Sequence, residues 1–210
     1  MNNIISPNML KTYDECPFKY YLRYIQQISA PQKETPFEKG KKIHALANYY
    51  LKGYDISKLE RTLSSEEFSV WQKLKTNEFY NKTYVNSEYN LSCKTNGYWI
   101  GGRIDAIVKD ENTYYILDYK TGSIPKEPAF DYQTMIYLLA AKKRFTDIKT
   151  FKFVYIDLKN NQNHIIELTD DLSEEYEKRI KTILDKIDST KDFSKTCTKY
   201  CEFFKLCRFS

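Results

Sequence analysis

Two adjacent extended segments in the middle of the chain constrain its fold most strongly. Residues 98 to 109 and 112 to 120 have the pattern of strands, and the polar turn Asp110-Glu111-Asn112 joins them. The run Tyr114-Tyr115-Ile116-Leu117 is apolar enough to indicate a strand in the centre of a sheet. The pair Gly101-Gly102 weakens a strand interior, which is tolerated where a bulge or a close backbone approach is needed. We therefore expect a sheet built around these two strands.

Three charged side chains of these strands are candidates for one site. Alternate side chains of a strand share a face, so Asp118 and Lys120 point the same way. If the strands pair as a hairpin, Asp105 can face the same side. Two carboxylates and a lysine around one point suit a divalent metal with a charged partner for a water or a phosphate. The alternative is a solvated sheet face, although a bare carboxylate on a central strand would be costly without a partner.

The rest of the chain divides into a helical first part and a mixed remainder. Ser6-Pro7 and the sequence Thr35-Pro36-Phe37-Glu38 are helix starts, and Pro17 should bend the first helix directly after Cys16. The expected helices run from residue 7 to about 28, 35 to 52, 64 to 80, 127 to 144 and 170 to 187. Three further strands are expected, at residues 82 to 94, 151 to 158 and 164 to 168. The turn Asn96-Gly97 connects the first of them to the strand that begins at residue 98.

This order of elements predicts the fold class. Helices, three strands, a helix, two strands and a last helix fit an α/β fold with a mixed central sheet flanked by helices. We expect a single domain over residues 1–210, with a helical part over 1–80, a core over 81–190 and a cysteine-bearing tail over 191–210.

Composition excludes some classes of protein. Hydrophobic residues make up 41%, so the chain is globular rather than disordered. No apolar run approaches the ~20 residues that span a bilayer, and the N-terminus lacks a signal-peptide core, so we expect a cytoplasmic protein. The net charge of +5 suits a polyanionic partner.

The cysteines form a second constellation. Cys197, Cys201 and Cys207 cluster near the C-terminus, and Cys16 is the candidate for a remote fourth thiolate. In a cytosolic chain such a cluster indicates metal binding rather than disulfides. Cys93 stands on a strand between polar residues and is expected to be a packing residue.

The strand motifs resemble those of the PD-(D/E)xK nuclease superfamily, in particular its RecB-like branch. The resemblance rests on Gly-Arg-Ile-Asp, which ends at Asp105, and on the sequence Leu-Asp-Tyr-Lys-Thr-Gly, which contains Asp118 and Lys120. It implies a restriction-endonuclease-like αβββαβ core and a DNA nuclease that uses Mg²⁺ or Mn²⁺. In that role Asp105, Asp118 and the backbone carbonyl of Tyr119 would hold one or two of these ions, and Lys120 would orient or deprotonate the attacking water.

Three further positions match the same branch. Gln133 and Tyr137 reproduce a Gln-x-x-x-Tyr motif, which implies that Gln133 positions Lys120 or the substrate and that Tyr137 contacts DNA. His44, four residues after Gly40, matches a helix histidine of the family and is implied as a metal ligand. By itself a histidine in an apolar helix is more often a packed core residue. Glu88 could be an outer-shell acid, but we expect a surface role.

The cysteine segments also resemble part of this family. Cys16-Pro17-Phe18-Lys19-Tyr20-Tyr21 is similar to the N-terminal cysteine segment of the iron-sulfur RecB-like nucleases, which include the AddB type and CRISPR-associated exonucleases. The resemblance implies a structural [4Fe-4S] cluster on Cys16, Cys197, Cys201 and Cys207 that ties both ends of the chain together. Those proteins generally space the last three as C-x2-C-x5-C, and here the first gap holds three residues. A zinc ion on the same thiolates and unliganded thiols are the alternatives.

The main functional hypothesis is therefore a metal-dependent DNA nuclease, a single-strand-preferring exonuclease. Basic residues with nearby aromatics at residues 19 to 23, 39 to 42 and 142 to 144 could line a groove for an unpaired strand. The expected partners are DNA, single-stranded or with single-stranded ends, and helicase, recombination or CRISPR-adaptation proteins. A non-catalytic DNA-binding partner subunit and a zinc-stapled RNA nuclease are the rival hypotheses.

Overall fold

A five-stranded mixed sheet organises the molecule. The computed structural model describes residues 4–29, 37–196 and 201–208. The strands lie in the order β1-β2-β3-β4-β5. Their bounds are β1 (Thr83–Thr95), β2 (Tyr98–Lys109), β3 (Thr113–Lys120), β4 (Thr150–Asp157) and β5 (Gln162–Glu167). Neighbouring strands are antiparallel except β3 and β4, which are parallel. The α/β class with a mixed sheet is thus confirmed.

The parallel pair depends on a helical crossover. A short 3-10 helix η2 (Pro128–Phe130) and helix α6 (Tyr132–Arg144) connect β3 to β4. Parallel neighbours need such a connection because a tight hairpin would reverse the chain. Strand β3 is buried along its length apart from Lys120, which agrees with its apolar sequence and its central place.

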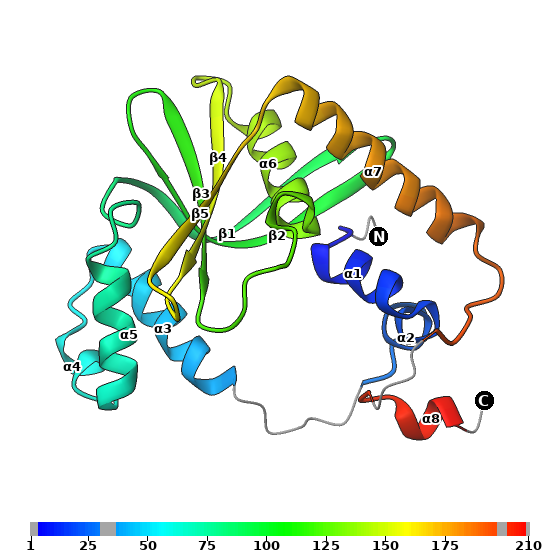
Figure 1. Ribbon diagram of the computed structural model, residues 1–210, viewed down its shortest axis with the longest axis horizontal. Coiled ribbons are helices and arrows are strands. Elements are labelled where there is room, and N and C mark those ends of the chain that lie inside the picture. Colours follow the sequence, from blue (N-terminus) through cyan, green and yellow to red (C-terminus); the bar gives the residue numbers. More distant parts are fainter. Residues whose placement is uncertain (1–3, 30–36, 197–200, 209–210) are drawn as a thin grey trace.

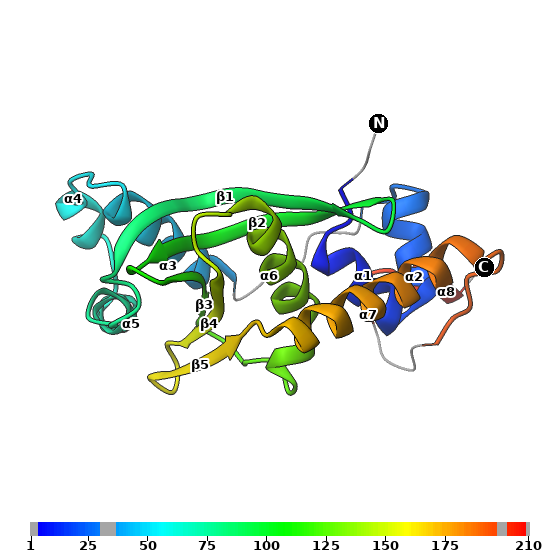
Figure 2. The same ribbon diagram turned by 90° about the horizontal axis from the view of Figure 1, so that it is seen from above.

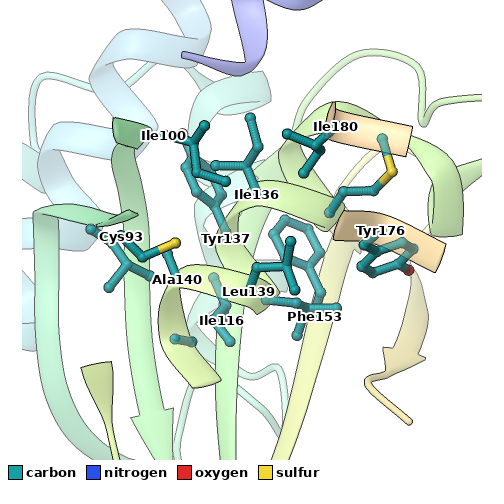
Figure 3. Packing of buried hydrophobic residues seen from close by; sticks show 14 of the residues in the cluster. Cys93, Ile100, Ile116, Ile136, Tyr137, Leu139, Ala140, Phe153, Tyr176 and Ile180 are labelled. Atoms are coloured by element: carbon teal, nitrogen blue, oxygen red, sulfur yellow. The ribbon is translucent and has the colours of Figure 1, made fainter. Parts of the chain in front are cut away.

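Helices pack against both faces of the sheet and create two hydrophobic clusters. On one face α6 and α7 (Asp170–Ser189) cover β3 and β4, and Figure 3 shows Ile136, Leu139 and Tyr176 meeting Ile116 and Phe153 there. On the other face α3 (Phe37–Leu51) and α5 (Ser65–Lys75) bury a second cluster. This cluster contains Ile43, Trp71, Leu117 and Val154. Alternate residues of β3 therefore pack into the hydrophobic clusters on opposite faces of the sheet.

The remaining helices gather at the two ends of the sheet, as Figures 1 and 2 show. α4 (Ser57–Glu60) lies beside α5 at one end. At the other end α1 (Pro7–Glu15), α2 (Pro17–Tyr20) and the π-helix η1 (Tyr21–Ile25) lie near the C-terminal helix α8 (Phe204–Arg208). The expected bend is found at Cys16, whose extended backbone (φ −166°, ψ 108°) separates α1 from α2.

Local capping explains where the helices begin. The Ser64 side chain accepts from the backbone N–H of Glu67, whose carboxylate accepts from the backbone N–H of Ser64, so the expected capping box opens α5. The proposed cap of α3 at Thr35 and Pro36 lies outside the described residues. Asp131 caps α6 and Thr169 caps α7.

Some expected boundaries were wrong. Helix α5 ends at Lys75 rather than near residue 80, because Asn77 accepts from the backbone N–H of Phe79 and forms a turn that brings Phe79 and Tyr80 into the core. Helix α6 begins at Tyr132 rather than near 127, since the chain before it is in η2. The short helices α4 and α8 were not expected. No helix in the described ranges has the length and apolar character that crossing a bilayer requires.

Candidate active site

The two central strands part at the candidate site. Backbone pairing between β2 and β3 extends to Ala106 and Leu117, and the same register places Asp105 opposite Asp118. Just beyond that point, the backbone N–H of Tyr119 donates to Oδ2 of Asp105 at 2.9 Å. A carboxylate thus takes the place of a main-chain partner and lies between the strands.

The regular alternation of side chains breaks at Asp105. Ile104 and Ile107 both belong to the cluster under α6, although they are three positions apart. Ala106 belongs to the cluster on the opposite face. Since strict alternation would send residues 104 and 106 to the same face, the strand changes orientation here. The break places Asp105 at the boundary between the two faces.

Gln133 connects the two predicted residues of β3. Its amide Nε2 donates to Oδ1 of Asp118 at 2.7 Å, and its Oε1 accepts from Nζ of Lys120 at 3.1 Å. Lys120 Nζ also lies 2.8 Å from Oδ2 of Asp118. The amide is oriented by its place in the first turn of α6, where Asp131 accepts from the backbone N–H of Gln133. An amide suits this position because it can donate to a carboxylate and accept from an ammonium.

Asp118 is a buried carboxylate with spare acceptor capacity. It is 6% exposed. Burial, together with the charge of Asp105, raises its pKa to about 6 against the opposing effect of Lys120. Among the described residues, its buried Oδ2 makes no well-aligned hydrogen bond and contacts the Lys120 ammonium as an ion pair. A buried acceptor of this kind, beside a second carboxylate, is chemically suited to a divalent cation.

His44 reaches the same point from the opposite face of the sheet. Its Nδ1 lies 3.0 Å from Oδ1 of Asp105, and its Nε2 lies 3.1 Å from the carbonyl oxygen of Tyr119. Burial alone would lower the pKa of His44, but the hydrogen bond and charge of Asp105 and the charge of Asp118 outweigh it, so the pKa is raised. The ring contacts the atoms that the sequence assigned to a metal, which a histidine serving only core packing would not do.

Tyr137 supports the strand that carries Asp105. Its side chain is 5% exposed and lies in the core under α6, as Figure 3 shows. The hydroxyl donates to the carbonyl oxygen of Arg103 at 3.2 Å. A Cβ at position 102 would lie 2.7 Å from that hydroxyl oxygen, so Gly102 is the residue that permits the contact. The contact of Tyr137 with DNA stays a prediction.

Glu88 joins the site although the sequence suggested a surface role. One ligand atom each from Glu88, His44 and Asp105 lie within 4.8 Å of one another. The pairs Ser87↔Ala106 and Tyr89↔Ile104 bracket Glu88 and Asp105, which therefore face each other across β1 and β2. Counting back along both strands from the Asn96-Gly97 turn would have found this neighbour.

The cavity over the site has a volume of about 1190 Å³. Helix α3 contributes one wall, α1 and the first turn of α6 contribute others, and the loop after β3 completes it. His44, Asp105, Tyr119, Lys120 and Gln133 are among its lining residues. Its cationic lining residues are Lys11, Lys41, Arg103 and Lys120. A space of this size with positive charge around carboxylates can receive a phosphate chain.

The cysteine-bearing segments lie side by side. Cys16 is buried, and Cys201 and Cys207 are partly buried, whereas Cys197 lies outside the described residues. The hydroxyl of Thr196 donates to the carbonyl of Glu15 at 3.1 Å. The backbone N–H of Phe18 donates to the carbonyl of Ser194 at 3.2 Å, so the tail contacts the chain on both sides of Cys16. The shared ligand set stays a prediction.

The fold and the site together define an α/β protein of the nuclease-like class. Paired aspartates, a lysine and a glutamine stand where the central strands of a mixed sheet separate. The chain belongs to the PD-(D/E)XK nuclease superfamily, whose family model matches residues 4–88 and 51–208. The superfamily expected from the strand motifs is thereby confirmed.

Two similar proteins extend this result. The CRISPR-associated exonuclease Cas4 of Francisella tularensis subsp. novicida (strain U112) is 22% identical over 207 residues, which cover 97% of this chain and 93% of that protein. The crystal structure of a candidate exonuclease from Eubacterium rectale superposes with a TM-score of 0.60 at 12% identity, covering 99% of this chain and 88% of the other. At such low identity the structural likeness shows the fold alone.

Proposed function

We propose that this protein is a metal-dependent deoxyribonuclease that degrades DNA from single-stranded ends. The observation that carries the proposal is the contact of His44 with both Asp105 and the Tyr119 carbonyl, beside the Asp118–Lys120 pair at the opposed position of β3. Structural ion pairs do not require two carboxylates, an imidazole and a main-chain carbonyl from three elements to meet beside a cavity. This donor set is suited to a hard divalent cation.

The four groups would hold Mg²⁺ or Mn²⁺. Carboxylate and carbonyl oxygens suit both ions, and an imidazole nitrogen is compatible with Mn²⁺ in particular. The ion would polarise a phosphodiester and supply a nucleophilic water at neutral pH. Asp118 is held ready for it by the amide of Gln133, which fixes Oδ1 and leaves Oδ2 toward Lys120.

Lys120 is the group we propose to act on the attacking water and on the phosphate. Its ammonium is placed by Gln133 and Asp118 and faces the cavity. There the ammonium orients the water and offsets charge on the phosphate oxygens, whereas deprotonation of the water requires the neutral amine of Lys120. In-line attack leaves a 5′-phosphate and a 3′-hydroxyl.

Two exposed tyrosine rings near the edge of the cavity support the proposed preference for single-stranded DNA. Tyr49 lines the cavity with 45% of its surface exposed, and Tyr54 beside it is 61% exposed. The two rings pack edge to face with centroids 5.9 Å apart. Exposed rings beside a cationic cavity can stack on unpaired bases, which a duplex keeps inside its own stack. The exonuclease name of the Cas4 relative agrees with action at strand ends.

We also propose a structural [4Fe-4S] cluster on Cys16, Cys197, Cys201 and Cys207. Its support is the contact of the C-terminal tail with the residues before and after Cys16, together with a set of four thiols, the usual ligands of such clusters. The cluster would hold the two ends of the chain together and needs no redox role.

The function is tested with Asp118→Asn on end-labelled single-stranded DNA with Mn²⁺ or Mg²⁺. We expect cleavage to fall by about 100-fold or more, because the asparagine lacks the charge a cation requires, while DNA binding is kept. Labels at the 5′ and 3′ ends report polarity, and a closed circular single strand distinguishes an exonuclease from an endonuclease.

The matched control is Asp171→Asn, an exposed aspartate of α7, which should cleave at the wild-type rate. Wild-type rates in Asp118→Asn would refute the proposed site. A wild-type protein that binds DNA but never cuts it with either metal would instead indicate a non-catalytic DNA-binding subunit.

A further inference from the structure

The ammonium of Lys120 lies over the ring of a buried tyrosine. Its Nζ is 5.6 Å from the centroid of the Tyr155 ring on β4. The side chain of Lys120 is only 25% exposed, and Tyr155 is fully buried. A cation within about 6 Å of an aromatic face is attracted by the ring quadrupole, and the attraction grows where water is excluded. The ring is therefore a third contact of the ammonium, beside Asp118 and Gln133.

The register of the sheet places this ring under the lysine. Tyr155 pairs with Asp118 across the parallel strands β3 and β4. Paired residues of neighbouring strands send their side chains to the same face of the sheet. That face is the one under α6, because Tyr155 belongs to the hydrophobic cluster there. Lys120 is two residues after Asp118, so it shares this face and extends over the ring.

The hydroxyl of Tyr155 fixes the ring to the first turn of α6. It lies 2.9 Å from Oγ1 of Thr134, and it donates to Oδ1 of Asp131 at 3.4 Å. The same Oδ1 accepts from the backbone N–H of Gln133. Burial, together with the charge of Asp131, raises the pKa of Tyr155, so the hydroxyl stays protonated and can donate. The ring is thus held relative to the residue that also contacts Lys120 through its amide.

A neutral contact suits the ammonium because its ion-pair partner has a second proposed role. Asp118 pairs with Lys120 and is also a proposed metal ligand, so a cation at Asp118 would compete with the ammonium for its carboxylate oxygens. The Tyr155 ring and the Gln133 amide carry no charge. They can hold the ammonium in place whether or not Asp118 is shared with a cation.

We propose that Tyr155 is a positioning residue for Lys120, and that its ring face keeps the ammonium directed toward the water and the phosphate. This inference rests on the proposed function, because it concerns the lysine of the same site. The competing explanation is an ordinary core tyrosine. It predicts that loss of the ring lowers the free energy of unfolding and leaves the cleavage rate of the folded protein unchanged.

The first test compares Tyr155→Leu with Tyr155→Phe in cleavage of end-labelled single-stranded DNA, at a temperature where circular dichroism shows the full-length variants folded. Tyr155→Leu should lower kcat by about 5- to 30-fold, because the cation–π contact is lost. KM should stay within about twofold, since the buried ring does not reach the cavity and a loss confined to kcat is a loss in the reaction step. Tyr155→Phe should keep most of the rate, because the ring face remains.

Phe151→Leu is the matched control. Phe151 is four residues earlier on β4, is 2% exposed and belongs to the same cluster as Tyr155. Its ring stacks on that of Tyr114, at the other end of the strand pair. The change from phenylalanine to leucine is the same one that separates the two Tyr155 variants. This control should lower the free energy of unfolding and leave kcat near the wild-type value.

A second measurement does not depend on cleavage. In the full-length protein without metal or DNA, the ring should shift the methylene protons next to the Lys120 ammonium upfield in nuclear magnetic resonance spectra of isotope-labelled lysine. Lys120→Arg identifies the resonance by removing it. The upfield shift should persist in Tyr155→Phe and disappear in Tyr155→Leu. If Tyr155→Leu fails to fold, the shift in the wild type and in Tyr155→Phe still decides whether the ring faces the lysine.

The outcomes separate this inference from the proposed function. A Tyr155→Leu variant with wild-type kcat, or a Tyr155→Phe variant as slow as Tyr155→Leu, overturns the positioning role. A wild type that cleaves DNA without an upfield shift at Lys120 also overturns it and leaves the nuclease standing. A wild type that shows the shift but cuts no DNA supports the placement of Lys120 and overturns the proposed function instead.

Discussion

At the scale of single residues, the candidate site depends on side chains that each satisfy two neighbours. Gln133 joins Asp118 to Lys120, and His44 joins Asp105 to the carbonyl of Tyr119. Such paired contacts hold charged groups of opposite sign at fixed positions before any substrate arrives, which lowers the cost of organising the site during a reaction.

Asp110, in the turn that joins the two central strands, should make stability depend on acid pH. The hydrogen bond from the Tyr115 hydroxyl, with those from Lys82 and the Asn112 backbone, lowers its pKa from 3.8 to about 2. A lowered pKa in the folded state stabilises the protein above pH ~4, and this contribution is lost as pH falls toward 2. The carboxylate is 40% exposed, so we expect less than about 1 kcal/mol.

The measurement is urea unfolding of wild type and Asp110→Asn. The variant should be less stable at pH 7, and the difference should shrink at pH 3, where the Asp110 carboxylate of the unfolded wild type is largely protonated. A difference that grows between pH 7 and pH 3 would contradict the assignment.

At the scale of elements, helices α6 and α3 place the site by close approach to the sheet. On one face Tyr137 of α6 meets the backbone of β2 above Gly102. On the other face α3 passes so close to the loop after β3 that a Cβ at Gly40 would lie 3.3 Å from Oγ1 of Thr121. His44 lies one helical turn after Gly40, so this close approach of α3 brings its ring within hydrogen-bonding distance of Asp105.

The contact of α6 with β2 predicts a specific rescue. Gly102→Ala should destabilise the fold by about 1–3 kcal/mol, because its Cβ would overlap the Tyr137 hydroxyl. Tyr137→Phe removes that oxygen and should cost about 1 kcal/mol through the lost hydrogen bond. When Tyr137→Phe is already present, Gly102→Ala should lower the free energy of unfolding clearly less than it does in the wild type. A double-mutant cycle measured by thermal unfolding gives this difference. Strict additivity would show that the overlap is relieved elsewhere.

Helix α3 also carries Tyr49, the ring of the aromatic pair that lines the cavity, and Tyr54 follows the end of the helix. Tyr49→Ala should weaken binding of a single-stranded oligonucleotide by about 5- to 100-fold, since stacking contributes roughly 1–3 kcal/mol per base. Duplex binding should change little. Phe68→Ala is the control, because Phe68 is similarly exposed at 44% but lies on α5, outside the cavity lining. Equal losses in both variants, measured by fluorescence anisotropy, would argue against a stacking role.

At the scale of the whole molecule, the two ends of the chain meet. Besides the backbone contacts around Cys16, Glu202 forms ion pairs with Lys19 and Arg23, and the Arg23 guanidinium lies over the buried Phe203 ring. These contacts bring together residues separated by almost the full sequence, so a metal cluster between them would constrain nearly the entire chain. The expected single domain of three parts stays a prediction.

The cluster is tested by anaerobic purification, visible absorption and metal analysis. The wild type should be brown and contain about four irons per chain. Cys16→Ser should lose the iron and unfold at a lower temperature, since the joined ends are released. Cys93→Ala is the control and should keep the iron, although its core packing is reduced. About one zinc and no iron would favour the zinc alternative, and a metal-free, equally stable wild type would refute both.

The sequence by itself determined much of the local structure and the superfamily. The extended pattern of β2, the apolar run of β3 and the turn between them depend on neighbours a few residues apart, so both strands could be predicted nearly to the residue. The superfamily followed from the short motifs around Asp105 and Asp118 for the same reason.

Only the tertiary structure decided how distant parts meet. The break in alternation at Asp105, the burial of Tyr137 and the early end of α5 all result from packing between elements far apart in the chain. The register from the Asn96-Gly97 turn could have placed Glu88 opposite Asp105, but its left-handed backbone conformation is not signalled by its sequence neighbours. Local propensities set the elements, whereas the burial of two hydrophobic faces on one sheet set the positions from which these side chains converge.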